Sequence, residues 1–350
     1  MTVKRLLLGI LGFLHLGVLL HGHSHTAHAT ERGTEHFSDK FHQARYSEAL
    51  AAFQVKVRDL NIPYQTFGVF VMPGERIPIR PEIGGFHPGF TLETDKGQVL
   101  THLERGSRIS WDWTAPKEPG VYPVVIRSNQ GQHVQLNMFV MRPAKELRSG
   151  FLGNYKVGLY PTAPLDGLDT YRAPQGFIEV DPGNRDVLVS PHFTLGQFLC
   201  KQKSKQPGPA YVVLREELLM KLEEVLARVN ESGIHATTLH VMSGYRTPSY
   251  NRGLGSARFS RHMYGDAADI FVDESPKDGV MDDLNRDGRI DVRDAAVLRE
   301  IVNDIDGTAR HPHPLVGGLG TYRANRYRGP FIHVDVRGKK VRWGVRSASK

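Results

Sequence analysis

Two well-separated segments carry two histidines and an aspartate in a pattern suited to a metal site. The first, at residues 260–269, reads SRHMYGDAAD, and the second, at residues 331–337, reads FIHVDVR. Two imidazoles and one carboxylate form a ligand set that catalytic zinc uses, with a fourth position left for water. Zinc lowers the pKa of that water to about 7, which makes hydroxide available at neutral pH. If these residues form a zinc site, the fold must bring both segments to one point.

Both segments have the composition of short β-strands. The run DIFV begins at Asp269, and FIHVDV begins at Phe331. Because side chains alternate between the two faces of a strand, His333 and Asp335 should point the same way as Phe331. His262 precedes the first strand, so we predict that a loop brings His262 and Asp269 to one metal with His333. The alternative is that the two histidines are ordinary polar residues.

Four motifs occur in order in the second half of the chain. They are SPHFTLGQFLC at residues 190–200, SGYRTPSYN at 243–251, SRHMYGDAAD at 260–269, and HVDVR at 333–337 followed by Arg342 and Trp343. Together they resemble the D-alanyl-D-alanine carboxypeptidase family of zinc peptidases, which includes D-Ala-D-Ala dipeptidases and murein endopeptidases. The resemblance covers residues 190–350 and implies an α+β zinc peptidase domain there.

The resemblance implies a role for each matched residue. His262, Asp269 and His333 would bind zinc. Arg246 would bind the carbonyl or carboxylate of the substrate and stabilise the oxyanion, a task suited to a fixed cationic fork. The substrates implied are peptidoglycan peptides.

The chain departs from the family pattern at the general base. Many members place a Glu three residues before the last His, or a His two residues before it, where this chain has Pro330 and Phe331. Asp335 could take the role, because it lies on the same strand face as His333. A general base must also lie within hydrogen-bond reach of the water. It could instead orient the ligand histidine, as carboxylates near metal sites commonly do. His311 and His313 are weaker candidates for the base.

A second metal pattern lies between the zinc motifs, in an insertion at residues 278–306. Its oxygen ligands at loop positions 1, 3, 5, 7, 9 and 12 would be Asp283, Asn285, Asp287, the Arg289 carbonyl, Asp291 and Asp294. Gly288 stands at position 6, where a calcium loop turns sharply. The pattern resembles a single dockerin-type or EF-hand-like loop with Asp in place of the usual Glu at position 12. We predict calcium as a structural brace, with an acidic turn as the alternative.

Residues 61–142 contain short strand candidates separated by turns rich in Gly, Pro and Asn. The candidates are residues 67–71, 90–94, 109–113, 121–126 and 134–140. Short strands at this spacing predict a β-sandwich, and the run WTAPKEPGVY resembles immunoglobulin-like bacterial surface modules. Trp111, Trp113 and Tyr122 are expected in its core, with a sugar-binding row as the alternative.

The other segments differ in character. Residues 30–60 are polar at first and then helix-like through residues 46–53. Residues 143–189 are rich in Gly, Pro and Tyr and are interpreted as a structured connector. The run REELLMKLEEVLARV at residues 215–229 has the apolar periodicity of a helix, and residues 295–302 form an amphipathic helix after the calcium loop.

Residues 1–29 have the pattern of a secretory signal. Lys4 and Arg5 precede an apolar run at residues 6–20, and residues 27–29 read AHA, which fits small-residue cleavage. The run is shorter than the ~20 apolar residues of a spanning helix, with an uncleaved anchor as the alternative. Cys200 is the only cysteine, which excludes an intramolecular disulfide.

The net charge of +8 falls to +6 when the signal is removed, because Lys4 and Arg5 leave with it. A basic surface suits an anionic polymer such as peptidoglycan. We expect no nucleic-acid partner, because the chain has no long Lys/Arg run and no aromatic-basic interleaving. We also expect no stable membrane insertion after signal cleavage.

We therefore predict a multidomain protein, periplasmic or secreted. Its fold class would be an N-terminal all-β immunoglobulin-like sandwich plus a C-terminal α+β zinc peptidase domain with a calcium-loop insertion. Its function would be cleavage of peptidoglycan peptides as a carboxypeptidase, dipeptidase or endopeptidase. The alternative is a non-catalytic protein that binds cell-wall peptides on the same fold. A calcium-dependent adhesion module would leave the four zinc motifs unexplained.

Overall fold

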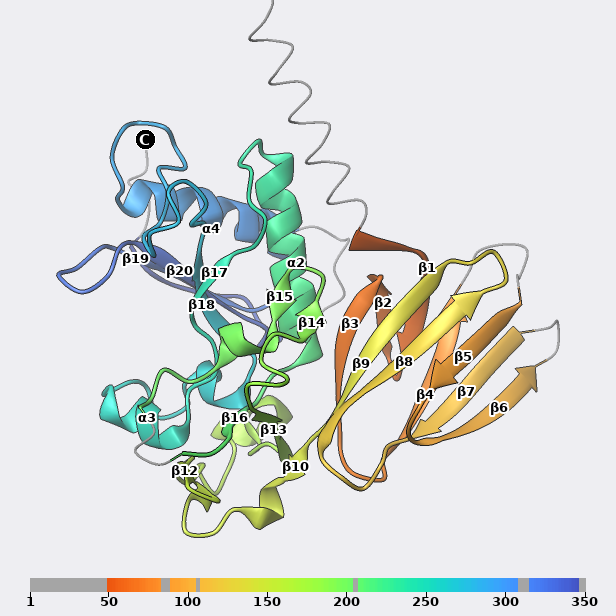
Figure 1. Cartoon of the computed structure of the whole chain (residues 1–350). Coiled ribbons are helices and arrows are strands. Elements are labelled where there is room, and N and C mark those ends of the chain that lie inside the picture. Colours follow the sequence, from red (N-terminus) through yellow and green to blue (C-terminus); the bar gives the residue numbers. More distant parts are fainter. Residues whose placement is uncertain (1–48, 83–88, 105–107, 204–206, 308–314, 346–350) are drawn as a thin grey trace, which may run out of the picture. The chain divides into compact units, whose positions relative to one another are not determined.

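The computed structural model describes residues 49–82, 89–104, 108–203, 207–307 and 315–345 (Figure 1). The predicted signal at residues 1–29, with Lys4 and Arg5, lies outside these ranges, as do His311 and His313. Within them, no helix combines the length and apolarity needed to cross a membrane. The described residues form several sheets and few helices, which confirms that the fold is rich in β-structure and is compatible with the predicted multidomain organisation.

Two sheets form the region predicted as a sandwich, with strand orders β2-β1-β4-β7-β6 and β3-β9-β8-β5. Their strands are β1 (Leu50–Val57), β2 (Leu60–Tyr64), β3 (Thr66–Val71), β4 (Arg76–Glu82), β5 (Phe90–Thr94), β6 (Gln98–Glu104), β7 (Arg108–Thr114), β8 (Gly120–Ser128) and β9 (His133–Val140). Neighbouring strands are antiparallel except β3 and β9. The rings of Phe53 and Phe90, one from each sheet, lie 4.9 Å apart in a shared apolar core.

All five strands predicted in this region are present, and the sequence prediction missed β1, β2, β4 and β6. Trp111 and Trp113 are buried, as predicted. Tyr122 is half-buried against the core, and its hydroxyl donates to the Glu118 carbonyl at 3.0 Å. The immunoglobulin-like assignment of these sheets stays a prediction.

The helix predicted for residues 46–53 is wrong for residues 50–53, because Leu50–Val57 form strand β1. Buried side chains at Phe53, Val55 and Val57 alternate with more exposed neighbours. This period of two buries one face of a strand. Pairing with β2 and β4 then overrides the helix propensity of the alanine-rich start.

Short elements follow the sandwich. The strands are β10 (Arg142–Pro143), β11 (Phe151–Leu152), β12 (Tyr155–Lys156), β13 (Gly176–Val180), β14 (Leu188–Ser190), β15 (Phe193–Thr194) and β16 (Ala210–Val212). The helical turns are η1 (Ala144–Glu146), η2 (Leu165–Gly167), η3 (Asp169–Tyr171) and η4 (Leu195–Phe198). Because β13 pairs with both β10 and β16, the connector shares a sheet with the segment that precedes the next helix.

A second five-stranded sheet, of order β17-β18-β20-β19-β21, forms the centre of the C-terminal region. Its strands are β17 (His240–Ser243), β18 (Ala267–Phe271), β19 (Gly318–Tyr322), β20 (Phe331–Asp335) and β21 (Val341–Gly344). The helices are α2 (Glu216–Glu231), α3 (Pro248–Gly253) and α4 (Val292–Gly307), with the turn η5 (Arg261–Tyr264) before β18. As Figure 1 shows, α2 packs against α4, which contacts β19 and β20. Both predicted helices are confirmed.

A buried ionic network ties these helices to the sheet. Lys221 of α2 donates to Asp306 of α4 at 3.0 Å and to the backbone carbonyl of Asp335 at 3.2 Å. Arg342 of β21 pairs with the other carboxylate oxygen of Asp306 at 2.6 Å. Removing one partner of a buried ion pair leaves an uncompensated charge, which is strongly destabilising. The network therefore fixes the end of β20, two residues beyond His333.

Candidate metal centre

The pairing of β18 with β20 brings two predicted ligands together. Asp269 and His333 are direct partners across these antiparallel strands, so their side chains share one face of the sheet. Asp269 Oδ1 lies 2.9 Å from His333 Nδ1. Strand register thus joins residues that are far apart in the sequence.

His262 reaches the same point from η5. This turn ends at Gly265, whose φ of 73° is left-handed and whose added Cβ would lie 2.5 Å from a neighbouring backbone carbonyl. Glycine alone fits such a reversal. Nδ1 of His262 donates to the carbonyl of Gly244 at 2.7 Å, and Nε2 therefore faces Asp269 Oδ1 at 3.2 Å.

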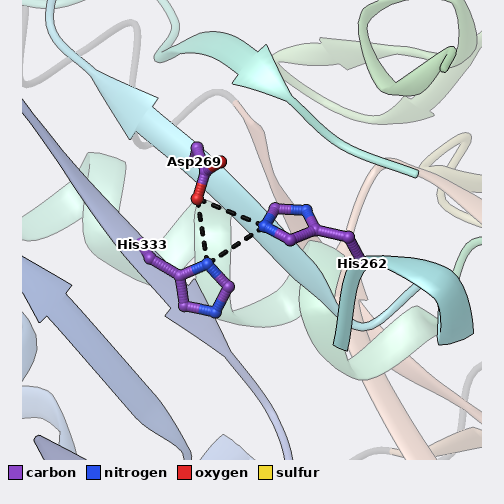
Figure 2. Close-up of side chains that lie close together, drawn as sticks. All are labelled: His262, Asp269 and His333. Atoms are coloured by element: carbon purple, nitrogen blue, oxygen red, sulfur yellow. Dashed lines mark hydrogen bonds and ion pairs between the residues drawn. The ribbon is translucent and has the colours of Figure 1, made fainter. Parts of the chain in front are cut away.

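The three side chains form a compact buried triangle (Figure 2). His262 Nε2 lies 3.1 Å from His333 Nδ1, and one ligand atom from each residue lies within 4.8 Å of the others. Ligands ~2.1 Å from a tetrahedral ion lie roughly 3.4 Å apart, so this donor set can hold a metal ion. Among the residues that the structure describes, it is the one group of three His, Cys, Asp or Glu side chains found at such distances.

Burial and charge prepare the triangle for a cation. Burial would raise the pKa of Asp269, but His262 and His333 hold that pKa well below its usual range. Burial lowers the pKa of His262, which favours the neutral imidazole. Burial acts the same way on His333, but hydrogen bonds to Asp269 and Asp335 raise its pKa overall. A metal needs neutral imidazoles and an ionised carboxylate, and a bound cation would replace the charge of a protonated His333.

Asp335 contacts the ring of His333 at the nitrogen that faces away from Asp269. Its carboxylate accepts from His333 Nε2 at 3.2 Å, from the Gly318 amide at 2.7 Å and from Arg337 Nε at 2.9 Å. Asp335 is fully buried; burial would raise its pKa, but His333 and Arg337 hold that pKa far below its usual range. The shared strand face of His333 and Asp335 is the one that side-chain alternation predicted.

Arg246 lies beside the ligands, in the loop between β17 and α3. Its Nε donates to Ser243 Oγ at 2.8 Å, and its Nη2 pairs with Asp269 Oδ2. Its backbone amide donates to the carbonyl of His262 at 3.1 Å. Both the side chain and the main chain of Arg246 are therefore fixed relative to the triangle.

A cavity of about 690 Å³ has the triangle and Arg246 in its lining. Residues 256–261, which lead into η5, line another part of it. Three aromatic side chains of the sheet, Tyr322, Phe331 and Trp343, also line the cavity. The candidate ligands therefore face a space large enough for part of a peptide.

Two tyrosines of the connector support the site, and sequence patterns did not predict them. Tyr160 donates to the Met263 carbonyl at 3.0 Å, and its hydroxyl lies 2.9 Å from that of Tyr245. The guanidinium of Arg261 lies 4.1 Å from the centre of the Tyr171 ring. Both tyrosines hold η5, and their only trace in the sequence is the tyrosine-rich composition of the connector.

Residues 191–292 match the family Peptidase M15. The match supports the resemblance to zinc D-Ala-D-Ala carboxypeptidase-like enzymes for the C-terminal region only. It contains Arg246, His262 and Asp269 and ends before His333, which the sheet adds to the same point. No curated protein matches the chain.

Two solved structures are similar to parts of the chain. One is the S-layer protein rSbsC(31-844), with 15% identity and a TM-score of 0.18, covering 27% of this chain and 14% of that one. The other is domains 4 and 5 of the S-layer protein SbsC, with 13% identity and a TM-score of 0.17, covering 26% of this chain and 54% of that one. The chain spans less than two thirds of either structure.

In the predicted calcium loop, backbone amides of the loop donate to its own carboxylates. The bonds join Asp287 and Gly288 to Asp283, Asn285 and Asp291 to Asp294, and Arg289 to Asp287, at 2.7 to 3.2 Å. The guanidinium of Arg293 also pairs with Asp287 and Asp291. The Peptidase M15 match does not bear on calcium, so calcium binding by this loop stays a prediction.

Calcium titration tests that prediction. If the loop binds calcium, calorimetry should show one site with a Kd in the range of about 10⁻⁷ to 10⁻³ M. Asp283→Asn should weaken calcium binding, because the substitution removes an anionic ligand. His262 lies outside the loop, so His262→Ala should leave calcium binding unchanged. No heat from the wild-type protein at millimolar calcium would reject the calcium site.

His262→Ala should weaken zinc binding by more than about 100-fold, because loss of a ligand should exceed the 10–100-fold cost of losing an orienting group. Competition with a zinc chelator measures the affinity. His240→Ala is the matched control, since His240 pairs with Asp273 at 3.1 Å outside the triangle. Equal zinc affinity in His262→Ala and the wild type would contradict this site.

Proposed function

We propose that this chain is an exported zinc-dependent peptidase that cleaves peptidoglycan peptides, of the D-alanyl-D-alanine carboxypeptidase or murein endopeptidase type. The observation that carries the proposal is the convergence of His262, Asp269 and His333 in one cavity with Arg246. The Peptidase M15 match over residues 191–292 supports it. Export, to the periplasm or the medium, rests on the signal-like sequence at residues 1–29.

Zinc bound by the triangle would supply a Lewis acid and an activated water. The chain's own part is to hold the ligands in position. His262 is oriented by the Gly244 carbonyl and His333 by the Asp335 carboxylate, so each imidazole directs one nitrogen at the same point. A ligand set fixed in this way loses little freedom when it binds its ion.

Arg246 would orient the substrate and stabilise the charge that develops on its carbonyl oxygen. Contacts with Ser243 and Asp269 hold two of the guanidinium nitrogens, while the side chain still lines the cavity. A prepositioned donor in a partly dry site stabilises an oxyanion more than the same donor does in water. The pairing with Asp269 also couples substrate binding to a metal ligand.

Asp335 is proposed as a positioning residue. Its carboxylate is fully buried, and His333, Gly318 and Arg337 all donate to it. A general base must reach the water that it deprotonates, whereas this carboxylate contacts His333 at the nitrogen that faces away from Asp269. Its role is therefore to fix the tautomer of His333.

A second candidate function is binding of cell-wall peptides without cleavage. The observation that favours it is the loss of the family's usual base positions to Pro330 and Phe331, while Asp335 is buried beside His333. Such a protein would use the cavity and Arg246 and would leave the peptide intact.

Digestion of purified muropeptides by the zinc-loaded mature chain tests the proposed function. Mass spectrometry should show loss of one D-Ala for a carboxypeptidase or conversion of cross-linked dimers to monomers for an endopeptidase, and a dipeptidase should split added free D-Ala-D-Ala into two D-Ala. His262→Ala should be inactive. Binding of muropeptides with no change in their mass would instead establish the non-catalytic alternative.

Asp335→Asn separates positioning from proton transfer. For a positioning residue, zinc affinity should fall by about 10–100-fold, and activity should recover when zinc is raised. For a general base, zinc would stay bound and turnover would fall by about 10²–10⁴-fold. Asp273→Asn, at a carboxylate paired with His240, is the control and should change neither. Zinc content and rate are measured on the same preparations.

A further inference from the structure

The lining of the cavity is strongly basic. Five arginines contribute to it (Arg246, Arg258, Arg261, Arg328 and Arg337), against a single acidic residue, Asp269. Three of these cations have carboxylate partners: Asp269 for Arg246, Asp266 for Arg261, and Asp335 for Arg337. Within the described ranges, Arg258 and Arg328 form no ion pair. A cavity with two unneutralised cations is a site for anionic groups.

Arg328 is held in place by aromatic packing rather than by an acid. Its guanidinium carbon lies 4.5 Å from the centre of the Phe331 ring and 5.8 Å from that of Tyr322. The two rings stack 4.5 Å apart with an interplanar angle of 2°, and Tyr322 accepts from Trp343 Nε1 at 2.8 Å. Stacking on aromatic faces leaves the edge of a guanidinium fork free for a planar anion.

The position of Arg328 ties it to the reaction centre. Phe331, on which it stacks, lies two residues before His333 in β20, so both side chains share one strand face. Both also line the same cavity. An anionic group bound by Arg328 would therefore belong to a substrate whose other part reaches the triangle.

Arg258 supplies a second cation from a different part of the lining. It lies in the segment before η5, with its guanidinium carbon 5.4 Å from the centre of the Phe259 ring. That ring makes an edge contact with Tyr171, at a centroid distance of 6.1 Å. Arg328 and Arg258 thus come from the sheet and from the η5 segment, on separate elements around one space.

We infer that this cavity selects acidic peptides, with Arg328 as a specificity-determining residue that binds a free carboxylate of the substrate near the cleaved bond, and Arg258 as a second such residue. The inference rests on the proposed function, since it names the substrate class of the same site. Arg–carboxylate pairs are often bidentate and charge-assisted. Replacing the carboxylate by a carboxamide removes the charge and one acceptor, so amidated peptides would be discriminated against.

The test uses two synthetic peptides that differ only in one group near the cleaved bond, a carboxylate in one and a carboxamide in the other. The wild-type zinc-loaded chain should have a KM about 5–10-fold lower for the acid, with similar kcat. Arg328→Gln should abolish this preference through KM alone, and Arg258→Gln should reduce it. Arg328→Lys keeps the positive charge but lacks the planar guanidinium group, so it should retain part of the preference for the acid.

Arg326→Gln is the matched control. Arg326 lies in the same loop and also stacks on an aromatic ring, with 4.4 Å to the centre of Tyr327, but it does not line the cavity. It should keep the wild-type preference. Equal effects of Arg326→Gln and Arg328→Gln, or no acid preference in the wild type, would overturn the inference.

Calorimetric binding of the same two peptides separates this inference from the proposed function. An acid preference in Kd that depends on Arg328, with neither peptide cleaved, supports the inference and refutes the peptidase. Cleavage of both peptides with equal KM supports the peptidase and refutes the inference.

Discussion

The register between β18 and β20 is the constraint on which the site depends. Asp269 stands opposite His333, and Ala267 stands opposite Asp335. A slip of one residue would turn His333 and Asp335 to the other face of the sheet. The ligand triangle, the support of His333 and the aromatic packing of Phe331 would then be lost together. The Lys221 network at the end of β20 helps to fix this register, because it binds the backbone of Asp335.

Sequence patterns predicted those parts of the protein that depend on local periodicity or on a linear motif. Alternation along β20 placed His333 and Asp335 on one face, and the leucine spacing predicted α2. The first strand was misread because an alanine-rich run has helix propensity, whereas β1 exists through pairing with its neighbours. Tyr160 and Tyr171 were missed for a related reason: contacts of an irregular segment follow from the tertiary fold and leave no period in the sequence.

The interior of the site is polar, and the side chains at the candidate metal ligands are held by hydrogen bonds. His262 bonds to a backbone carbonyl, His333 to Asp335, and Arg246 to Ser243 and Asp269. A fully satisfied network specifies a single arrangement, while a partly satisfied one costs free energy. Among the five arginines that line the cavity, only Arg258 and Arg328 have no carboxylate partner within the described residues. The chain thus combines a fixed interior with a cavity lining that attracts anions.

The order of the ligands along the chain has a topological consequence. His262 and Asp269 are near neighbours, whereas His333 follows only after α4 and β19. An ion held by all three would link segments roughly 60 residues apart in the sequence, and it would stabilise the folded state because the unfolded chain has no such site. With a single cysteine and hence no internal disulfide, the cation would serve as the chain's cross-link. Binding of the ion would then stabilise the fold as well as complete the site.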